Sequence, residues 1–323
     1  MRVWPRALAL LLPLALALQA AAAPYPSQPI RWVVPYTPGG ITDTVTRMVA
    51  QKLQESLGQP MVVENKPGAN SIVGADLVAK APADGYTILT VIAAHAINTT
   101  LYAGKLPFDP VKSFTPVSLA ATAPLILTAN NDFPVRDVKG LIQYARANPG
   151  KVTFGSSGIG ASAHLTTELL KQAAGIDMLH VPFKGTAPAL TALLAGDIQI
   201  LADVPSSMMA HVRGGKIRAL GMFSASRVPG AAEVPTLAEA GGPAVEGSTW
   251  VMFLAPAGTP PEVVSRLSGE VQRAISSPEM RERFSSLGMD AVGSNPAEAA
   301  RFLESEIAKW QGVITKAGVK ADP

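Results

Sequence analysis

The chain contains the same local pattern twice: a short apolar run, a loop rich in Gly, Ser or Thr, and then a segment of helical periodicity. The first run is Ile30–Val34 with the loop 36–43, and the second is 152–154 with the loop 155–162. A loop that enters a helix presents unpaired backbone N–H groups at the positive end of the helix dipole. Because Gly lets a ligand approach the backbone, the two junctions predict an anion site shared by two lobes.

The rest of the chain continues this alternation. Short apolar runs of β type and helical periodicities follow one another after residue 24, which predicts an α/β fold with largely parallel sheets. Apolar residues make up 48% of the chain and charged residues only 16%, which excludes a disordered chain. The length of 323 residues suggests two domains. Three final helices are expected near 263–275, 280–287 and 296–314, packed back onto the first lobe.

The N-terminus has the pattern of a secretory signal peptide. Arg2 and Arg6 precede the apolar run 7–18, and small residues fill 20–23. The alternative is a membrane anchor, but a span needs about 20 apolar residues. We expect residues 1–23 to be removed, which lowers the formal net charge from +3 to +1 because two arginines and no acidic residue leave. A large chain without Cys then fits the bacterial periplasm.

Common cofactor motifs are absent or incomplete. The loop 155–160 has the wrong Gly spacing for a dinucleotide fingerprint, and no Gly-Lys-Ser/Thr exists for a P-loop. The lack of Cys excludes thiol catalysis and iron–sulfur clusters, and the four His residues have no metal-ligand spacing. We therefore expect no metal and no cofactor. The near-neutral mature chain also predicts no nucleic-acid partner.

Three other functions stay open on the residues alone. Ser157 or Ser162 with His164 would suit a secreted α/β serine hydrolase, although Ile159 replaces the second Gly of the esterase elbow. Asp43 and Asp203 would suit a general acid/base pair; otherwise Asp43 caps its helix and Asp203 ends a strand. The effector domain of a transcriptional regulator shares a two-lobed architecture, but the leader and the lack of room for a DNA-binding module argue against it.

Eight motifs run in order over nearly the whole mature chain. They are PYTPGGITD at 35–43, ENKPGA at 64–69, APADGYTIL at 81–89, LPFDP at 106–110, GSSG at 155–158, HVPFKG at 180–185, GKIRAL at 215–220 and PTLAEAG at 235–241. With these motifs the chain resembles the extracytoplasmic solute receptors of tripartite tricarboxylate transporters, also called Bug proteins. The resemblance implies an α/β fold of the type II periplasmic binding protein class, a two-lobed flytrap with a ligand cleft between the lobes. Lobe 1 would comprise 24–126 and 251–323, and lobe 2 would comprise 127–250.

The resemblance also implies that main-chain N–H groups of the two junctions hold a ligand carboxylate, with bridging waters. The implied positions are Tyr36, Thr37, Gly39, Gly40 and Asp43 in the first lobe and Ser156, Ser157, Ala161, Ser162 and His164 in the second, with Ala94, Asn98, Phe183, Lys184, Gly185 and Asp203 as further wall residues. Where the family usually has Gly-Ala-Gly-Gly, this chain has Gly68-Ala-Asn-Ser71. Asn70 and Ser71 thus add polar side chains beside the first-lobe wall, which bears on the ligand end that is accepted.

The leading interpretation is a periplasmic receptor, and not an enzyme, that captures a small carboxylated metabolite. The candidates are di- or tricarboxylates, amino acids and aromatic acids. The implied partners are this ligand and the membrane permease subunits of a tripartite tricarboxylate transporter, and the receptor is expected to be a monomer. Because neither loop contains Arg or Lys, we expect helix dipoles, rather than an ion pair, to neutralise the carboxylate.

Overall fold

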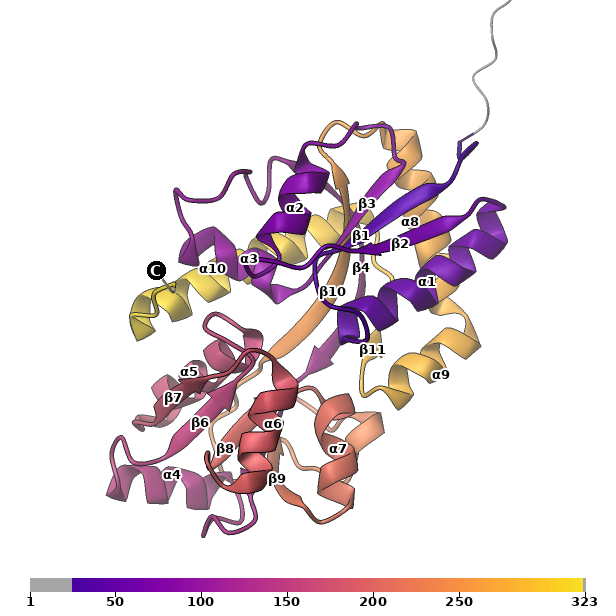
Figure 1. Ribbon diagram of the computed structural model, residues 1–323. Coiled ribbons are helices and arrows are strands. Elements are labelled where there is room, and N and C mark those ends of the chain that lie inside the picture. The colour runs from indigo at the N-terminus through magenta and orange to yellow at the C-terminus, as the bar shows by residue number, and fades with distance from the viewer. Residues whose placement is uncertain (1–24, 322–323) are drawn as a thin grey trace, which may run out of the picture.

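The computed structural model describes residues 25–321, so the predicted signal peptide lies outside the described residues. Within this range eleven strands form two sheets, and helices pack on both of them (Figure 1). No helix of the described range combines the length and the apolar character that a membrane crossing requires.

The first sheet has six strands in the order β11-β4-β10-β3-β1-β2. The strands are β1 (Ile30–Val34), β2 (Met61–Asn65), β3 (Thr87–Val91), β4 (Phe114–Pro124), β10 (Ser248–Pro256) and β11 (Asp290–Ala291). Its central strands are nearly continuous apolar runs, and β3 is buried at all five positions. Such runs are expected where helices cover both faces of a sheet.

Six helices cover this sheet. They are α1 (Ile41–Leu57), α2 (Ile72–Ala79), α3 (Ala93–Leu101), α8 (Pro261–Ser276), α9 (Pro278–Ser286) and α10 (Pro296–Ala317). Trp32 packs with Phe253 on the face covered by α1 and α8, with ring centroids 4.7 Å apart. The next residue, Val33, faces the other side, where it joins Trp250 and Trp310 under α2, α3 and α10.

The second sheet has five strands in the order β7-β6-β8-β5-β9. The strands are β5 (Ile126–Asn130), β6 (Thr153–Ser156), β7 (Leu179–Pro182), β8 (Ile200–Asp203) and β9 (Ile217–Met222). The helices around it are α4 (Val138–Ala147), α5 (Ser162–Ala174), α6 (Thr186–Ala195) and α7 (Pro205–Arg213), with a short 3-10 helix at Pro229–Ala231. Leu193 of α6 and Met208 of α7 pack on one face, and Leu141 of α4 and Leu170 of α5 pack on the other.

Both sheets are mixed, so the expectation of largely parallel sheets is wrong. Strand β1 runs parallel to β2 and β3, and β6 runs parallel to β7 and β8. However, β10 is antiparallel to β3 and β4, and β5 is antiparallel to β8 and β9. The reason is the path between the sheets: β5 enters the second sheet directly from the first, and β10 returns from it. Each of these two strands therefore runs opposite to its neighbours in the sheet.

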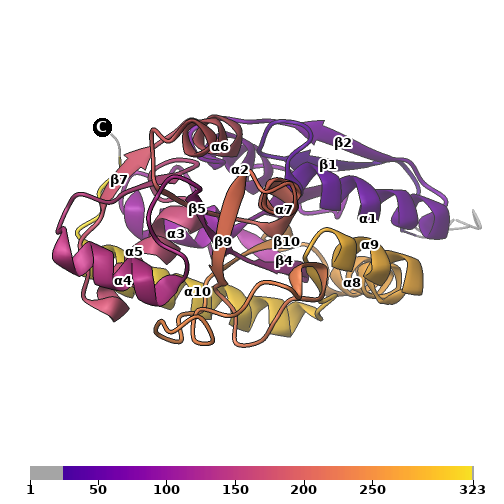
Figure 2. The same cartoon turned by 90° about the horizontal axis from the view of Figure 1, so that it is seen from below.

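The two lobes are joined at several places. Leu125 alone separates β4 from β5, and β10 begins at Ser248, which pairs with Pro124. Helix α10 packs behind the first sheet in the view of Figure 1, where it contacts α3 and β4, and it also contacts α5 of the second lobe (Figure 1 and Figure 2). The exact lobe boundaries at 126/127 and 250/251 stay predictions.

Two helices, α3 and α7, were not expected from the sequence. Each follows directly after a strand, α3 after β3 and α7 after β8. Helix α3 mixes Ala with Asn and Thr, and α7 begins with Pro-Ser-Ser, so neither segment shows a clear apolar periodicity. Both helices nevertheless begin at the site described next.

Candidate functional site

A cavity of about 660 Å³ lies between the two lobes, a volume typical of sites for small ligands. Its walls come from loops that follow strands of both sheets. The first lobe contributes residues within 35–44, 67–71 and 92–94, the second contributes residues within 157–163, 185–186 and 203–207, and the remaining lining residues are Leu125, Thr249, Leu287 and Met289.

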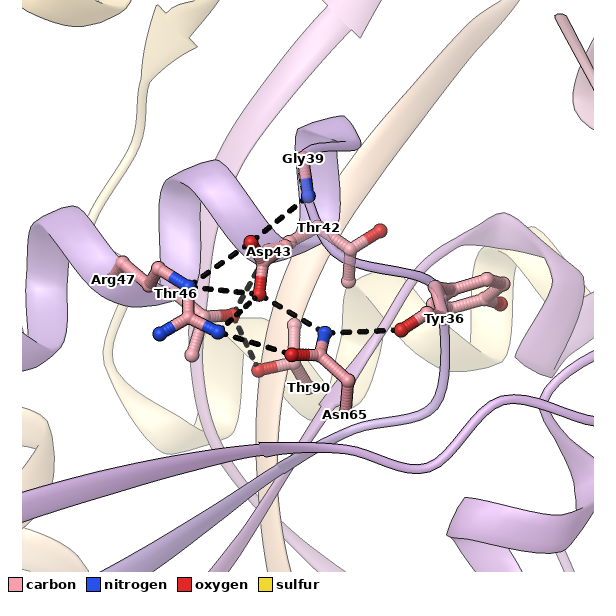
Figure 3. Close-up of polar contacts among 8 residues, drawn as sticks. All are labelled: Tyr36, Gly39, Thr42, Asp43, Thr46, Arg47, Asn65 and Thr90. Carbon is pink, nitrogen blue, oxygen red and sulfur yellow. Dashed lines mark hydrogen bonds and ion pairs between the residues drawn. The ribbon is translucent and has the colours of Figure 1, made fainter.

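The first junction is held from behind by the carboxylate of Asp43 (Figure 3). Oδ2 of Asp43 accepts the Gly39 backbone N–H, Oδ1 accepts Nδ2 of Asn65, and Nε of Arg47 donates to both oxygens, all at 3.0 Å. The same Asn65 nitrogen donates to the Tyr36 carbonyl at 3.0 Å. Burial by itself would raise the pKa of the Asp43 carboxyl, but these donors outweigh burial and lower the pKa. Asp43 thus stays ionised and fixes the loop.

The second junction is held by a stacked pair of histidines. Nε2 of His180 lies 2.7 Å from Oγ of Ser156, which donates to the Gly158 carbonyl at 2.9 Å. Nδ1 of His164 accepts the Gly160 N–H at 3.1 Å. The two imidazole rings are nearly parallel, with centroids 3.7 Å apart. These contacts fix both ends of the glycine-rich loop.

The serine–histidine pairs that a hydrolase needs are not formed. Within the described residues no hydrogen bond joins His164 to Ser157 or Ser162, and Ser156, which does contact a histidine, is fully buried. Burial is the main reason that the pKa is about 3 for His164 and about 4 for His180. Both rings are therefore neutral at neutral pH, and they position a loop.

Six helices begin at the cavity without a side-chain cap. Their N-cap residues all line the cavity, and none of these side chains bonds to the first turn of its helix; they are Gly40, Ser71, Ile92, Ala161, Gly185 and Val204. Of the helices that begin elsewhere, α4, α9 and α10 are capped by Asp137, Ser277 and Asn295, whereas α8 begins at Pro260 without a cap.

The uncapped first turns make the cavity favourable for an anion. Their N–H groups lack partners inside the helix and lie at the positive end of the helix dipole. In α2, the carbonyls of Gly68 and Ala69 already accept from Val73 and Ile72. In α1, α5 and α6 no such bond occupies the first turn within the described part of the chain. None of the described residues that line the cavity is Lys, Arg or His.

Asp203 is the one acidic residue among the described residues of the cavity wall. Its Oδ2 accepts from Oγ1 of Thr186 and its Oδ1 accepts the Val204 N–H, both at 2.7 Å. Burial raises the pKa of the Asp203 carboxyl, although the two hydrogen bonds act in the opposite direction. An acid at the end of β8 thus faces the same space as the helix N-termini.

Ten of the sixteen positions expected from the sequence line the cavity. These are Tyr36, Thr37, Gly39, Gly40, Ala94, Ser157, Ala161, Ser162, Gly185 and Asp203. Asp43, Ser156 and His164 instead hold the loops from behind, and Asn98 bonds to Asn70. Phe183 packs against the apolar cluster under α6, and Lys184 is exposed.

Several polar wall residues were missed by the sequence reasoning. Thr186 directly follows the HVPFKG motif, which was the available signal for it. Ser206 and Ser207 belong to the first turn of α7, a helix that the sequence did not predict. Thr44 and Thr249 lie within regular elements and carried no motif.

Comparison with known proteins agrees with this geometry. The sequence model of the family described as "Tripartite tricarboxylate transporter family receptor" matches residues 45–319 of this chain. Protein BugT of Bordetella pertussis is 36% identical over 307 residues, which cover 94% of each chain. The structure of R. palustris Rpa4515 with adipate is similar at a TM-score of 0.84 and 35% identity, covering 92% of this chain and 99% of that one.

A second solved structure, MatC from Rhodopseudomonas palustris with bound malate, is similar at a TM-score of 0.79 and 32% identity, covering 90% of this chain and 100% of that one. The described chain therefore has the two-lobed α/β fold of periplasmic binding proteins. With the family model matched over most of its length, it belongs to the tripartite tricarboxylate transporter receptor family, which includes the Bug proteins.

Proposed function

We propose that this protein is a periplasmic receptor that captures a small carboxylate between its lobes and delivers it to the membrane subunits of a tripartite tricarboxylate transporter. The observation that carries the proposal is the set of uncapped helix N-termini around a cavity whose described lining has no basic side chain. Such a site stabilises one or more negative charges through backbone dipoles.

The relatives favour a dicarboxylate as the ligand. Rpa4515 is bound to adipate and MatC to malate. Binding, rather than bond cleavage, is also what the family membership supports. The predicted signal peptide supports export to the periplasm, and closure of the lobes around the ligand would remove water and bring donors from both loops together.

Isothermal titration calorimetry on the secreted, processed protein tests this function. We expect one-to-one binding with malate or adipate, and no heat with malamide or adipamide, which keep the shape of the ligand without its charge. A chain that binds none of the dicarboxylates, tricarboxylates, amino acids and aromatic acids is not the receptor proposed. Ester hydrolysis that disappears in Ser157→Ala would instead favour the hydrolase.

A further inference from the structure

The turn between β2 and α2 has an unusual backbone. Ala69, Asn70 and Ser71 are consecutive, none is Gly, and their φ angles are 44°, 48° and 75°. This left-handed conformation costs free energy for any residue other than Gly, although less for Asn. Three such residues in a row persist only if the surroundings hold them, and strain of this kind is concentrated at ligand sites.

The surroundings hold this turn firmly. Nδ2 of Asn70 donates to Oδ1 of Asn98 at 2.9 Å, and Nδ2 of Asn98 donates back to the Asn70 carbonyl at 2.8 Å. Asn98 lies on α3 and is buried. At the other side, the Ala69 carbonyl accepts from Ile72 at 3.1 Å. Because these bonds use the first N–H of α2, the side chains of the turn are what this end of the helix offers to a ligand.

Three polar side chains meet the cavity at this point. Tyr36, Asn70 and Ser71 all line it. The Tyr36 hydroxyl is buried and has no partner of hydrogen-bond geometry, although the Ser71 hydroxyl lies beside it. Ser71 does not cap α2 with its own side chain, because its left-handed backbone is not that of an ordinary N-cap. Burial raises the pKa of Tyr36, so the phenol stays a neutral donor.

We propose that Tyr36, Asn70 and Ser71 form a polar subsite that binds the second carboxylate of a dicarboxylate ligand. This inference rests on the proposed function, in which the first turns of α1, α5 and α6 hold the other carboxylate. The phenol O–H, the serine O–H and the remaining N–H of Asn70 are three neutral donors for two carboxylate oxygens. A monocarboxylate with an apolar end offers the Tyr36 hydroxyl no acceptor, so it gains no bond at this subsite and should bind more weakly than the dicarboxylate.

Matched ligand pairs test the subsite in Tyr36→Phe. The pairs are adipate with hexanoate and malate with 3-hydroxybutyrate, each titrated calorimetrically. We expect the variant to bind the dicarboxylate about ten-fold more weakly, as for a lost bond to a charged group, and the monocarboxylate within two-fold of wild type. The matched control is Tyr144→Phe, which removes the hydroxyl of a ring that packs on Phe133 in the second lobe and should change neither affinity.

Thermal unfolding separates ligand recognition from support of the fold. The Tyr36 hydroxyl has no partner in the unliganded protein, so Tyr36→Phe should keep or raise the Tm without ligand. The double variant Asn70→Gly with Ser71→Gly relieves the left-handed strain but loses the bond from Asn70 to Asn98, so its Tm should stay near that of wild type. It should lose preference for the dicarboxylate of each pair.

The outcomes are distinguishable. A wild-type protein that binds no carboxylate overturns both the proposed function and the subsite. A wild-type protein that binds both members of each pair equally overturns the subsite alone. Equal loss of both members in Tyr36→Phe, or an unchanged preference in both variants, would also overturn it.

Discussion

At the scale of single residues, the protonation state of Asp203 affects the charge of the cavity wall. The carboxyl group of Asp203 faces the cavity that we propose binds an anion, and no basic side chain of the described range lines that cavity. An ionised Asp203 repels a bound carboxylate, whereas a protonated one does not. Because burial raises the pKa of Asp203 above its ordinary value near 3.8, the protonated form persists to higher pH than for an exposed carboxyl.

Asp203→Asn is therefore expected to strengthen the binding of a dicarboxylate at a pH above the raised pKa of Asp203, where the wild-type carboxyl is ionised. The gain should be several-fold, since one repulsive charge is removed while the shape is kept: Oδ1 of Asn can still accept the Val204 N–H, and its Nδ2 can donate to the Thr186 hydroxyl. In wild type, the affinity for the ionised ligand should rise as pH falls through the raised pKa of Asp203, and in the variant it should be flat. Calorimetry at pH 5, 6 and 7, corrected for the ionisation of the ligand, measures both effects.

Weaker binding by Asp203→Asn at every pH would contradict this expectation. It would mean that the Asp203 carboxylate contacts a donor or a cationic group of the ligand.

The raised pKa of Asp203 also has a consequence for stability. The unliganded wild type should lose unfolding free energy as pH rises above the ordinary carboxyl value, because the unfolded chain releases this proton first. Asp203→Asn should lack this part of the pH dependence.

At the scale of elements, the N-termini of the helices differ between the cavity and the rest of the molecule. Asn295 and Glu298 form a reciprocal capping box on α10, remote from the cavity, and Ser277 caps α9. At the cavity, α5 begins after Ala161, whose backbone (φ −67°, ψ 153°) is that of an ordinary N-cap but whose side chain has no acceptor. The helix thus forgoes a cap worth about 1 kcal/mol, and its free N–H groups remain available to a ligand.

Ala161→Asp is expected to raise the stability of the unliganded protein and to lower its affinity for the ligand. The introduced carboxylate would cap α5 and occupy the N–H groups that we propose hold the ligand, stabilising the unliganded protein by about 0.5–2 kcal/mol. The dicarboxylate affinity should fall more than ten-fold, because the new charge also repels the ligand. Urea unfolding and calorimetry measure the two changes.

The matched control is Ala161→Asn, which caps the helix without adding charge. It should stabilise the protein to a similar extent and bind the dicarboxylate better than Ala161→Asp does. Wild-type affinity in the Asp variant would show that the first turn of α5 does not hold the ligand.

Local patterns explain which elements could be predicted. Strands such as β1 and β3 are nearly continuous apolar runs, and helix α1 ends at Gly58, whose backbone is left-handed. Both kinds of element could therefore be predicted from the sequence. The directions of β5 and β10 could not be predicted, because direction depends on the path between lobes. Asp43 was expected at the ligand, yet it holds the loop through Gly39 and Arg47, since a local motif does not tell which side of a loop a side chain faces.

At the scale of the whole molecule, the two lobes are joined by packing as well as by the chain. Strands β4 and β5 are nearly continuous, and α10 contacts both lobes, with Nε2 of Gln172 on α5 donating to the Val313 carbonyl at 3.5 Å. Glu306 fixes α10 to the first sheet, because its Oε2 accepts the indole N–H groups of Trp250 and Trp310, both at 2.8 Å. The cavity is thus complete only when both lobes are folded and joined.

Differential scanning calorimetry tests this coupling. A ligand that binds only the folded protein adds about 2.7 kcal/mol of stability at one hundred times its Kd, which should raise the Tm by roughly 5 °C for a chain of this size. Because both lobes line the cavity, we expect one transition that moves as a whole when malate or adipate is added. Ala161→Asp should show a smaller shift under the same conditions, because its weaker affinity leaves less ligand bound to the folded protein. Two transitions, of which the ligand moves only one, would instead mean that a single lobe holds the ligand and that the other closes over it without contributing to its affinity.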